Sequence, residues 1–180
     1  MRALIVVDVQ NDFLPGGALA IPDGDAVVAP INRLMSNASQ MISLATQDWH
    51  PADHCSFAEN HQGKKPGDVV EVNGCEQTLW PVHCVQGTPG AEFAPDLDSH
   101  RFAEVFKKGI DPLVDSYSGL FDNERRRATG LAAHLDGLGV DTVFVAGLAT
   151  DYCVKFTALD VLALGRRTIL VSAGCRRVDL

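Results

Sequence analysis

The stretch that decides the fold is TVFVAGLATDYCVKFTALDVLALGRRTILVS, residues 142–172. Its two ends, TVFVA and RTILVS, are short apolar runs rich in β-branched residues, typical of strands buried on both faces of a parallel sheet. Between them, an apolar helix is predicted over residues 150–164, closed by Gly165. A strand, a helix and a second strand in this order predict one unit of a parallel α/β sheet.

The same alternation runs through the rest of the chain. Further strands are predicted at residues 3–7, 41–46 and 104–106, and further helices at residues 25–35 and 123–138. We therefore predict a three-layer α/β/α sandwich with a mostly parallel central sheet. Residues 1–180 are expected to form a single domain, with a long metal-site excursion at about residues 51–103, where prolines, glycines and histidines gather.

Composition excludes several classes of protein. The formal net charge of -8 over 180 residues argues against sequence-independent nucleic-acid binding, which needs a basic face. No apolar run approaches the roughly 20 residues that cross a bilayer. The five cysteines form no CxxC pair, so a disulfide framework is not expected and a reducing compartment suits them. We expect a cytoplasmic protein with a small-molecule partner and neither nucleic-acid nor membrane partners, and a homo-oligomer stays an option.

Reactive groups follow the predicted strands. Asp8, Asp48 and Lys108 each come just after one, and Cys153 follows the strand TVFVA by a short turn. In open parallel sheets, functional groups gather beyond the carboxyl ends of the strands. These side chains are therefore expected to share one edge of the sheet.

Cys153 is the candidate nucleophile. It lies in the first turn of the helix predicted at residues 150–164, where the helix dipole favours a thiolate and backbone N–H groups can hold an oxyanion. The alternative is a packed core thiol, since free cysteine is commonly buried. Its position alone does not decide between the two.

Asp8 and Lys108 are candidates for proton transfer and charge stabilisation. Asp8 ends an apolar strand, where a carboxylate needs a cationic neighbour or has a raised pKa. Beside a thiol, it could act as a general base. The alternatives are a carboxylate that caps a loop and, for Lys108, a solvated surface charge.

A mixed set of aspartate and histidine suggests a metal site. Asp48 and His50 stand two residues apart, so both can face one cation, and His54 and His83 could complete the set. These ligands suit zinc, iron or manganese. The alternative is a group of hydrogen-bonded loop histidines.

Six segments, in this order, carry a family resemblance. They are VVDVQNDF (6–13), TQDWHPADH (46–54), WPVHCVQGTPGAEF (80–93), VFKKG (105–109), DSYSGLFDN (115–123) and GLATDYCV (147–154). Together they resemble the nicotinamidase/pyrazinamidase branch of the isochorismatase-like hydrolases, and the resemblance extends from Val6 to about Gly174.

The resemblance implies roles for particular residues. The catalytic triad would be Asp8, Lys108 and Cys153, and an oxyanion hole would use the backbone N–H groups of Ala149 and Cys153, with a cis peptide between Leu148 and Ala149. The implied metal ligands are Asp48, His50 and His83, with His54 as a further candidate. The implied substrate-binding aromatics are Phe13, Trp80 and Tyr117, for which ordinary core packing is the alternative.

The implied activity is that of a metal-dependent cysteine amidohydrolase acting on linear carboxamides. It would convert nicotinamide to nicotinate and ammonia through a thioester, in NAD salvage, and would also deaminate pyrazinamide. One divalent metal ion is expected, with zinc preferred over iron or manganese. The alternatives are another cysteine amidase of the same superfamily and a non-catalytic metal-binding module.

One departure from the family concerns the end of the sequence. The chain stops at CRRVDL, soon after the strand RTILVS, where similar proteins continue. The expected sheet therefore lacks the final helix and strand of the family.

Overall fold

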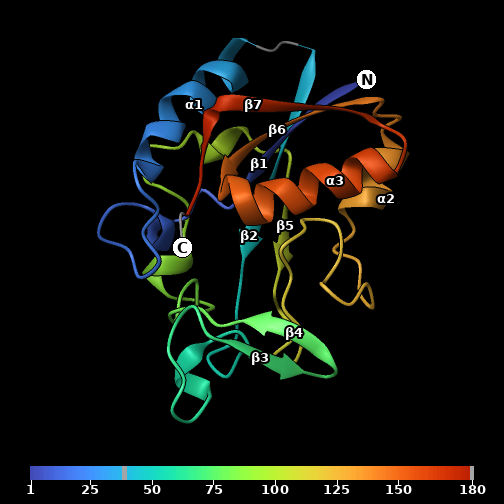
Figure 1. The fold of residues 1–180 in the computed structure, drawn as a ribbon. Helices are drawn as coiled ribbons and strands as arrows, with labels where there is room; N and C mark the ends of the chain where they lie inside the picture. Colours follow the sequence, from blue (N-terminus) through green and yellow to red (C-terminus); the bar gives the residue numbers. More distant parts are fainter. Residues whose placement is uncertain (38–39, 179–180) are drawn as a thin grey trace.

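A five-stranded parallel sheet forms the centre of the described residues, 1–37 and 40–178, in the computed structural model (Figure 1). The predicted domain limit at residue 180 lies outside the described residues. In spatial order the strands are β5 (Glu104–Lys108), β2 (Met41–Asp48), β1 (Arg2–Val7), β6 (Thr142–Leu148) and β7 (Arg167–Arg176).

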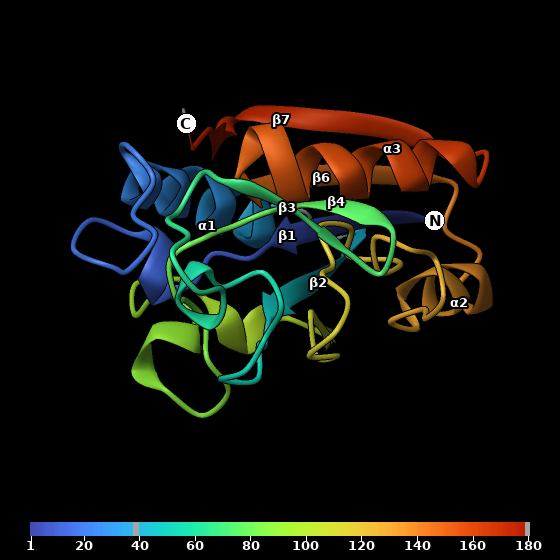
Figure 2. The same ribbon diagram turned by 60° about the horizontal axis from the view of Figure 1, so that its bottom comes forward.

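Helices cover both faces of this sheet, because side chains alternate across its strands. On β1, Leu4 and Val6 pack in the cluster that includes Ile31 of α1 (Val28–Asn37). Ile5 and Val7 face the opposite way, into the cluster that includes residues of α2 (Leu131–Gly137) and α3 (Lys155–Ala163). Figures 1 and 2 show α1 on one side of the sheet and α2 and α3 on the other. The predicted three-layer sandwich with a parallel sheet is confirmed.

Two predicted helices are shorter than expected. In place of a helix over residues 123–138, α2 begins only at Leu131. The carboxylate of Asp122 accepts the N–H groups of Arg126 and Arg127 and holds this segment in a turn, and Gly130 has a left-handed backbone with φ of 98°. The helix expected at residues 25–35 begins with a 3₁₀ turn over Gly24–Val27, and α1 follows it.

The segment predicted as irregular contains a β-hairpin. Its strands are β3 (Val69–Val72) and β4 (Cys75–Thr78), and they project beyond the carboxyl ends of the sheet strands (Figure 1). The turn is Asn73-Gly74, and both residues have positive φ. Asn-Gly is the strongest short hairpin signal in a sequence, so this hairpin could have been predicted.

Two of the site residues lie inside strands that were predicted to end before them. Both β2 and β5 continue two residues further than expected, so Asp48 and Lys108 are the last residues of their strands and pair directly with each other. Asp8 follows β1, as predicted. The helix expected at 150–164 begins as a π-helical turn over Thr150–Val154 before α3. None of the helices in the described residues has the length and apolar character needed to cross a membrane.

Candidate active site

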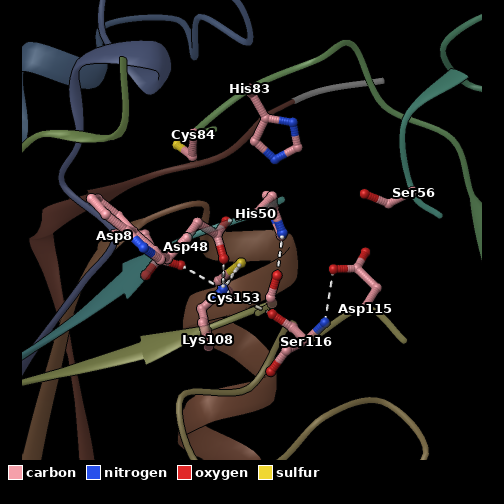
Figure 3. Close-up of polar contacts among 12 residues, drawn as sticks. Asp8, Asp48, His50, Ser56, His83, Cys84, Lys108, Asp115, Ser116 and Cys153 are labelled. Carbon is pink, nitrogen blue, oxygen red and sulfur yellow. Dashed lines mark hydrogen bonds and ion pairs between the residues drawn. The ribbon is translucent and has the colours of Figure 1, made fainter. Parts of the chain in front are cut away.

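The Lys108 ammonium lies at the centre of the site, fully buried among the strand ends (Figure 3). It forms an ion pair with Asp8 Oδ2 at 2.9 Å and donates to Asp48 Oδ1 at 2.5 Å. It also donates to the carbonyl of Ser116 at 2.8 Å and to Cys153 Sγ at 3.4 Å. Burial would lower the pKa of Lys108, but Asp48 and Asp8 hold it well above its ordinary value. The site therefore contains a permanent cation between two carboxylates and a thiol.

The two carboxylates differ in their tendency to ionise. Burial raises the pKa of Asp8 to about 6, although Lys108 and the hydroxyl of Thr46, which donates to Asp8 Oδ1 at 2.6 Å, both oppose the rise. Burial also works to raise the pKa of Asp48, but Lys108 and His50 hold it below its usual range. Asp48 is thus a fixed anion, whereas Asp8 can exchange a proton near neutral pH.

Cys153 is buried in the π-helical turn, and its sulfur lies within 4.8 Å of carboxylate oxygens of Asp8 and Asp48. Burial raises the pKa of this thiol well above its ordinary value, and Lys108 only partly offsets the effect. Desolvation and the two neighbouring carboxylates thus oppose a thiolate here, whereas the position at a helix start favours one. The peptide between Leu148 and Ala149 is cis, as the resemblance implied.

Asp48, His50 and His83 form one group whose ligand atoms all lie within 4.8 Å of one another. The Nδ1 of His50 pairs with the carbonyl of Gly109 at 2.9 Å, and that of His83 pairs with the carbonyl of Pro81 at 2.7 Å. A carbonyl accepts a hydrogen bond only from a protonated nitrogen, so Nε2 is the nitrogen of each ring that can bind a cation. Burial opposes a charge on His50, but Asp48 raises the pKa of His50, so a cation that binds this Nε2 would displace any proton on it. Burial also lowers the pKa of His83 to about 4, which keeps this imidazole neutral. The group therefore fits a divalent cation with nitrogen and oxygen ligands.

His54 lies beside this group and outside it. Its ring lies against that of His50 at a tilt of 38°, with centroids 4.2 Å apart, and its Nδ1 pairs with Ser56 Oγ at 2.7 Å. Its buried Nε2 has no hydrogen-bond partner. His54 joins His50 and Asp115 in a second compact group of ligand atoms, and Asp115 was not identified from the sequence.

An apolar pocket opens beside Cys153 and the Asp48–His50–His83 group, with an empty volume of about 430 Å³. Phe13, Trp80 and Tyr117 all line it, as the resemblance implied, and so do Ala149 and Cys153. Trp80 Nε1 donates to the Tyr117 hydroxyl at 3.3 Å, which fixes both rings. Besides the polar residues Asp115 and Ser116, four hydrophobic lining residues were missed in the sequence: Leu19, Ile21, Tyr152 and Val178. Of these, Tyr152 alone carried a signal, as the neighbour of Cys153 and an aromatic residue.

Known proteins resemble this chain over nearly its whole length. The isochorismatase domain model matches residues 2–179. The nicotinamidase of Escherichia coli (strain K12) is 50% identical over 99% of this chain and 84% of its own length. The solved nicotinamidase/pyrazinamidase of Acinetobacter baumanii superposes with a TM-score of 0.95 and 45% identity, over 99% of this chain and 86% of that one. The pyrazinamidase of Pyrococcus horikoshii, solved in complex with zinc, gives a TM-score of 0.80 and 38% identity, over 99% and 87%.

Proposed function

The chain belongs to the isochorismatase family, within its nicotinamidase branch, and we propose that it hydrolyses nicotinamide to nicotinate and ammonia through a thioester on Cys153. One observation carries the proposal. The buried ammonium of Lys108 contacts both the Cys153 sulfur and the Asp8 carboxylate, and Cys153 lines an apolar pocket. A nucleophile, a base and a charge-stabilising group are thus placed together where a flat ring can enter.

In the first half-reaction, Asp8 accepts the thiol proton and Cys153 Sγ bonds to the carboxamide carbon. The neutral resting thiol and an Asp8 pKa of about 6 suit this transfer, because the carboxylate is ionised at neutral pH. The oxyanion would accept hydrogen bonds from the amides of Ala149 and Cys153. Asp8 then returns the proton to the leaving nitrogen, the C–N bond breaks, and ammonia departs.

In the second half-reaction, water attacks the thioester carbon. Asp8 accepts one proton from this water and passes it to the Cys153 sulfur as the C–S bond breaks, which restores the thiol. The other proton stays on the new carboxyl group and is released to solvent as the product ionises to nicotinate. Lys108 stays charged throughout and stabilises each anion that forms between Asp8 and Cys153.

Asp48, His50 and His83 are the proposed ligands of one divalent metal ion, with His54 as a candidate fourth ligand. Zinc is the preferred ion, since a related pyrazinamidase was solved with zinc, and iron and manganese are the alternatives. When bound, the ion would supply a Lewis acid beside the ring and the attacking water. The ionised Asp48 and the neutral His83 already have the protonation states that ligands need.

The pocket favours a neutral aromatic carboxamide. The rings of Phe13, Trp80 and Tyr117 can enclose a pyridine ring and exclude water from the thioester. Pyrazinamide has the same outline and should react as well. We place the reaction in NAD salvage in the cytoplasm, where a reducing environment would keep the Cys153 thiol free.

The direct test is ammonia release from nicotinamide by the purified protein, before chelation, after chelation and after zinc is restored. We expect turnover that is lost on chelation and recovered with zinc. A protein that binds zinc but releases no ammonia from nicotinamide or pyrazinamide would instead be a non-catalytic metal-binding module. Ammonia release that survives complete metal removal would contradict the proposed metal centre.

A further inference from the structure

The strands β1 and β2 separate just before the site. Their paired register ends at Val7 and Thr46, because Asp8 has a left-handed φ of 50° and turns the chain out of the sheet. β2 continues to Asp48, which pairs with Lys108 of β5 on its other side. The edge of Asp48 that faces β1 therefore has to find partners outside the strand register.

The side chain of Gln10 supplies those partners. It is fully buried, its Oε1 accepts the N–H of Asp48 at 2.8 Å, and its Nε2 donates to the carbonyl of Asp48, also at 2.8 Å. The same Nε2 donates to the carbonyl of Ala91 at 2.8 Å. The amide thus takes the place of the β1 peptide group that would otherwise pair with Asp48.

We propose that Gln10 is a positioning residue that fixes the orientation of Asp48 for metal binding. This inference rests on the proposed function, in which Asp48 is a metal ligand. A primary amide presents an acceptor and a donor at one end, so it can bind both peptide groups of Asp48 at once. With the backbone held on both sides, the carboxylate keeps one direction, toward Lys108 and His50.

Gln47 offers a matched control. It is also a buried glutamine, it is the direct neighbour of Asp48, and its Nε2 donates to the same carbonyl of Ala91 at 2.9 Å. In the structure, its side chain makes no hydrogen bond to the peptide groups of Asp48. Substitution of either glutamine therefore removes a buried amide and its hydrogen bond to Ala91. Only substitution of Gln10 also removes the hydrogen bonds to Asp48.

The test is zinc affinity, measured by competition with a chromophoric chelator, for the wild type, Gln10→Met, Gln10→Glu and Gln47→Met. Methionine keeps the length of the side chain and removes both hydrogen bonds to Asp48. Loss of an outer partner of a metal ligand typically weakens affinity about 10- to 100-fold, and we expect this for Gln10→Met. Gln10→Glu should also bind zinc more weakly, because a carboxylate oxygen would face the carbonyls of Asp48 and Ala91. Gln47→Met should bind zinc like the wild type.

Circular dichroism of the zinc-free proteins shows which variants fold. Equal zinc affinity in Gln10→Met, or in Gln10→Glu if the methionine variant does not fold, would overturn the inference. Failure of both Gln10 variants to fold while Gln47→Met folds would also overturn it, since Gln10 would then serve the stability of the sheet. A wild type that binds no zinc would instead contradict the proposed metal centre itself.

Discussion

At the scale of single residues, one ammonium group contacts two carboxylates whose pKa values shift in opposite directions. Lys108 contacts Asp48 at 2.5 Å and Asp8 at 2.9 Å, yet the pKa of Asp48 lies below its ordinary value and that of Asp8 above. His50 adds a second stabilising group beside Asp48, whereas Asp8 also faces the negative charge of Asp48. This difference separates a permanent anion, suited to a metal, from an acid–base group, suited to a thiol.

The first prediction concerns pH. A protonated Asp8 cannot accept the thiol proton, so kcat/KM for ammonia release should fall as the pH drops through about 6. Thr46→Val removes the hydrogen bond that lowers the pKa of Asp8, so in this variant the fall should begin at a higher pH. A pH profile of both proteins checks this. If kcat/KM falls at the same pH in Thr46→Val as in the wild type, another group than Asp8 controls the fall.

The reactive residues could be located from sequence because each has a chemical signature and a strand end beside it. Asp8, Asp48, Lys108 and Cys153 all follow that rule. The aliphatic pocket residues Leu19, Ile21 and Val178 could not, because a leucine, isoleucine or valine in a loop carries no such signature. Val178 reaches the pocket only through the path of the chain after β7, where its N–H donates to Asp151.

At the scale of elements, the junction after β5 shapes the candidate metal site. Gly109 has a φ of 63°, and its carbonyl accepts the His50 Nδ1–H. A Cβ built on Gly109 would lie 2.3 Å from the His50 ring, too close for the ring to stay in place. Glycine is therefore required here for space as well as for backbone conformation.

The second prediction compares two glycines. Gly139 has a φ of 62°, and a Cβ added there meets nothing within 4 Å. Gly109→Ala and Gly139→Ala therefore share a backbone cost of about 1–2 kcal/mol, but Gly109→Ala alone displaces His50. We expect only Gly109→Ala to weaken zinc binding and ammonia release, measured against Gly139→Ala. Similar zinc affinity in the two variants would show that His50 does not need this space.

Sequence-based prediction succeeded for the helices and strands that the hydrophobic pattern alone determines. All five sheet strands were predicted, and the clearest apolar runs among them are those of β1 and β6. The segment at 123–130 looked helical, but the hydrogen bonds of Asp122 and the left-handed Gly130 hold it in a turn, and a pattern of leucines cannot show such contacts.

At the scale of the whole molecule, the site ties distant parts of the chain together. Asp8, Asp48 and Lys108 come from three neighbouring strands, and His83 comes from the long segment between β2 and β5. An unfolded chain would scatter the proposed ligands Asp48, His50 and His83, so a metal ion bound by all three would stabilise the folded state.

The third prediction follows from this linkage. Zinc at about 100 times its Kd should add roughly 2.7 kcal/mol to the free energy of unfolding, so chelation should lower the thermal midpoint and zinc should restore it. The variant His50→Ala, which lacks a proposed ligand, should show little response to zinc. Thermal unfolding with and without chelator checks both. A wild-type midpoint indifferent to zinc would contradict a bound ion at this site.

The central claim is that Cys153 attacks the carboxamide, and ammonia release by Cys153→Ala tests it most directly. Removal of a catalytic nucleophile can cost about 10⁶-fold in turnover, so we expect no detectable ammonia, while nicotinamide still binds. Cys75→Ala, which removes an exposed thiol outside the pocket, should retain wild-type turnover. Substantial ammonia release by a folded, metal-loaded Cys153→Ala protein would contradict the claim.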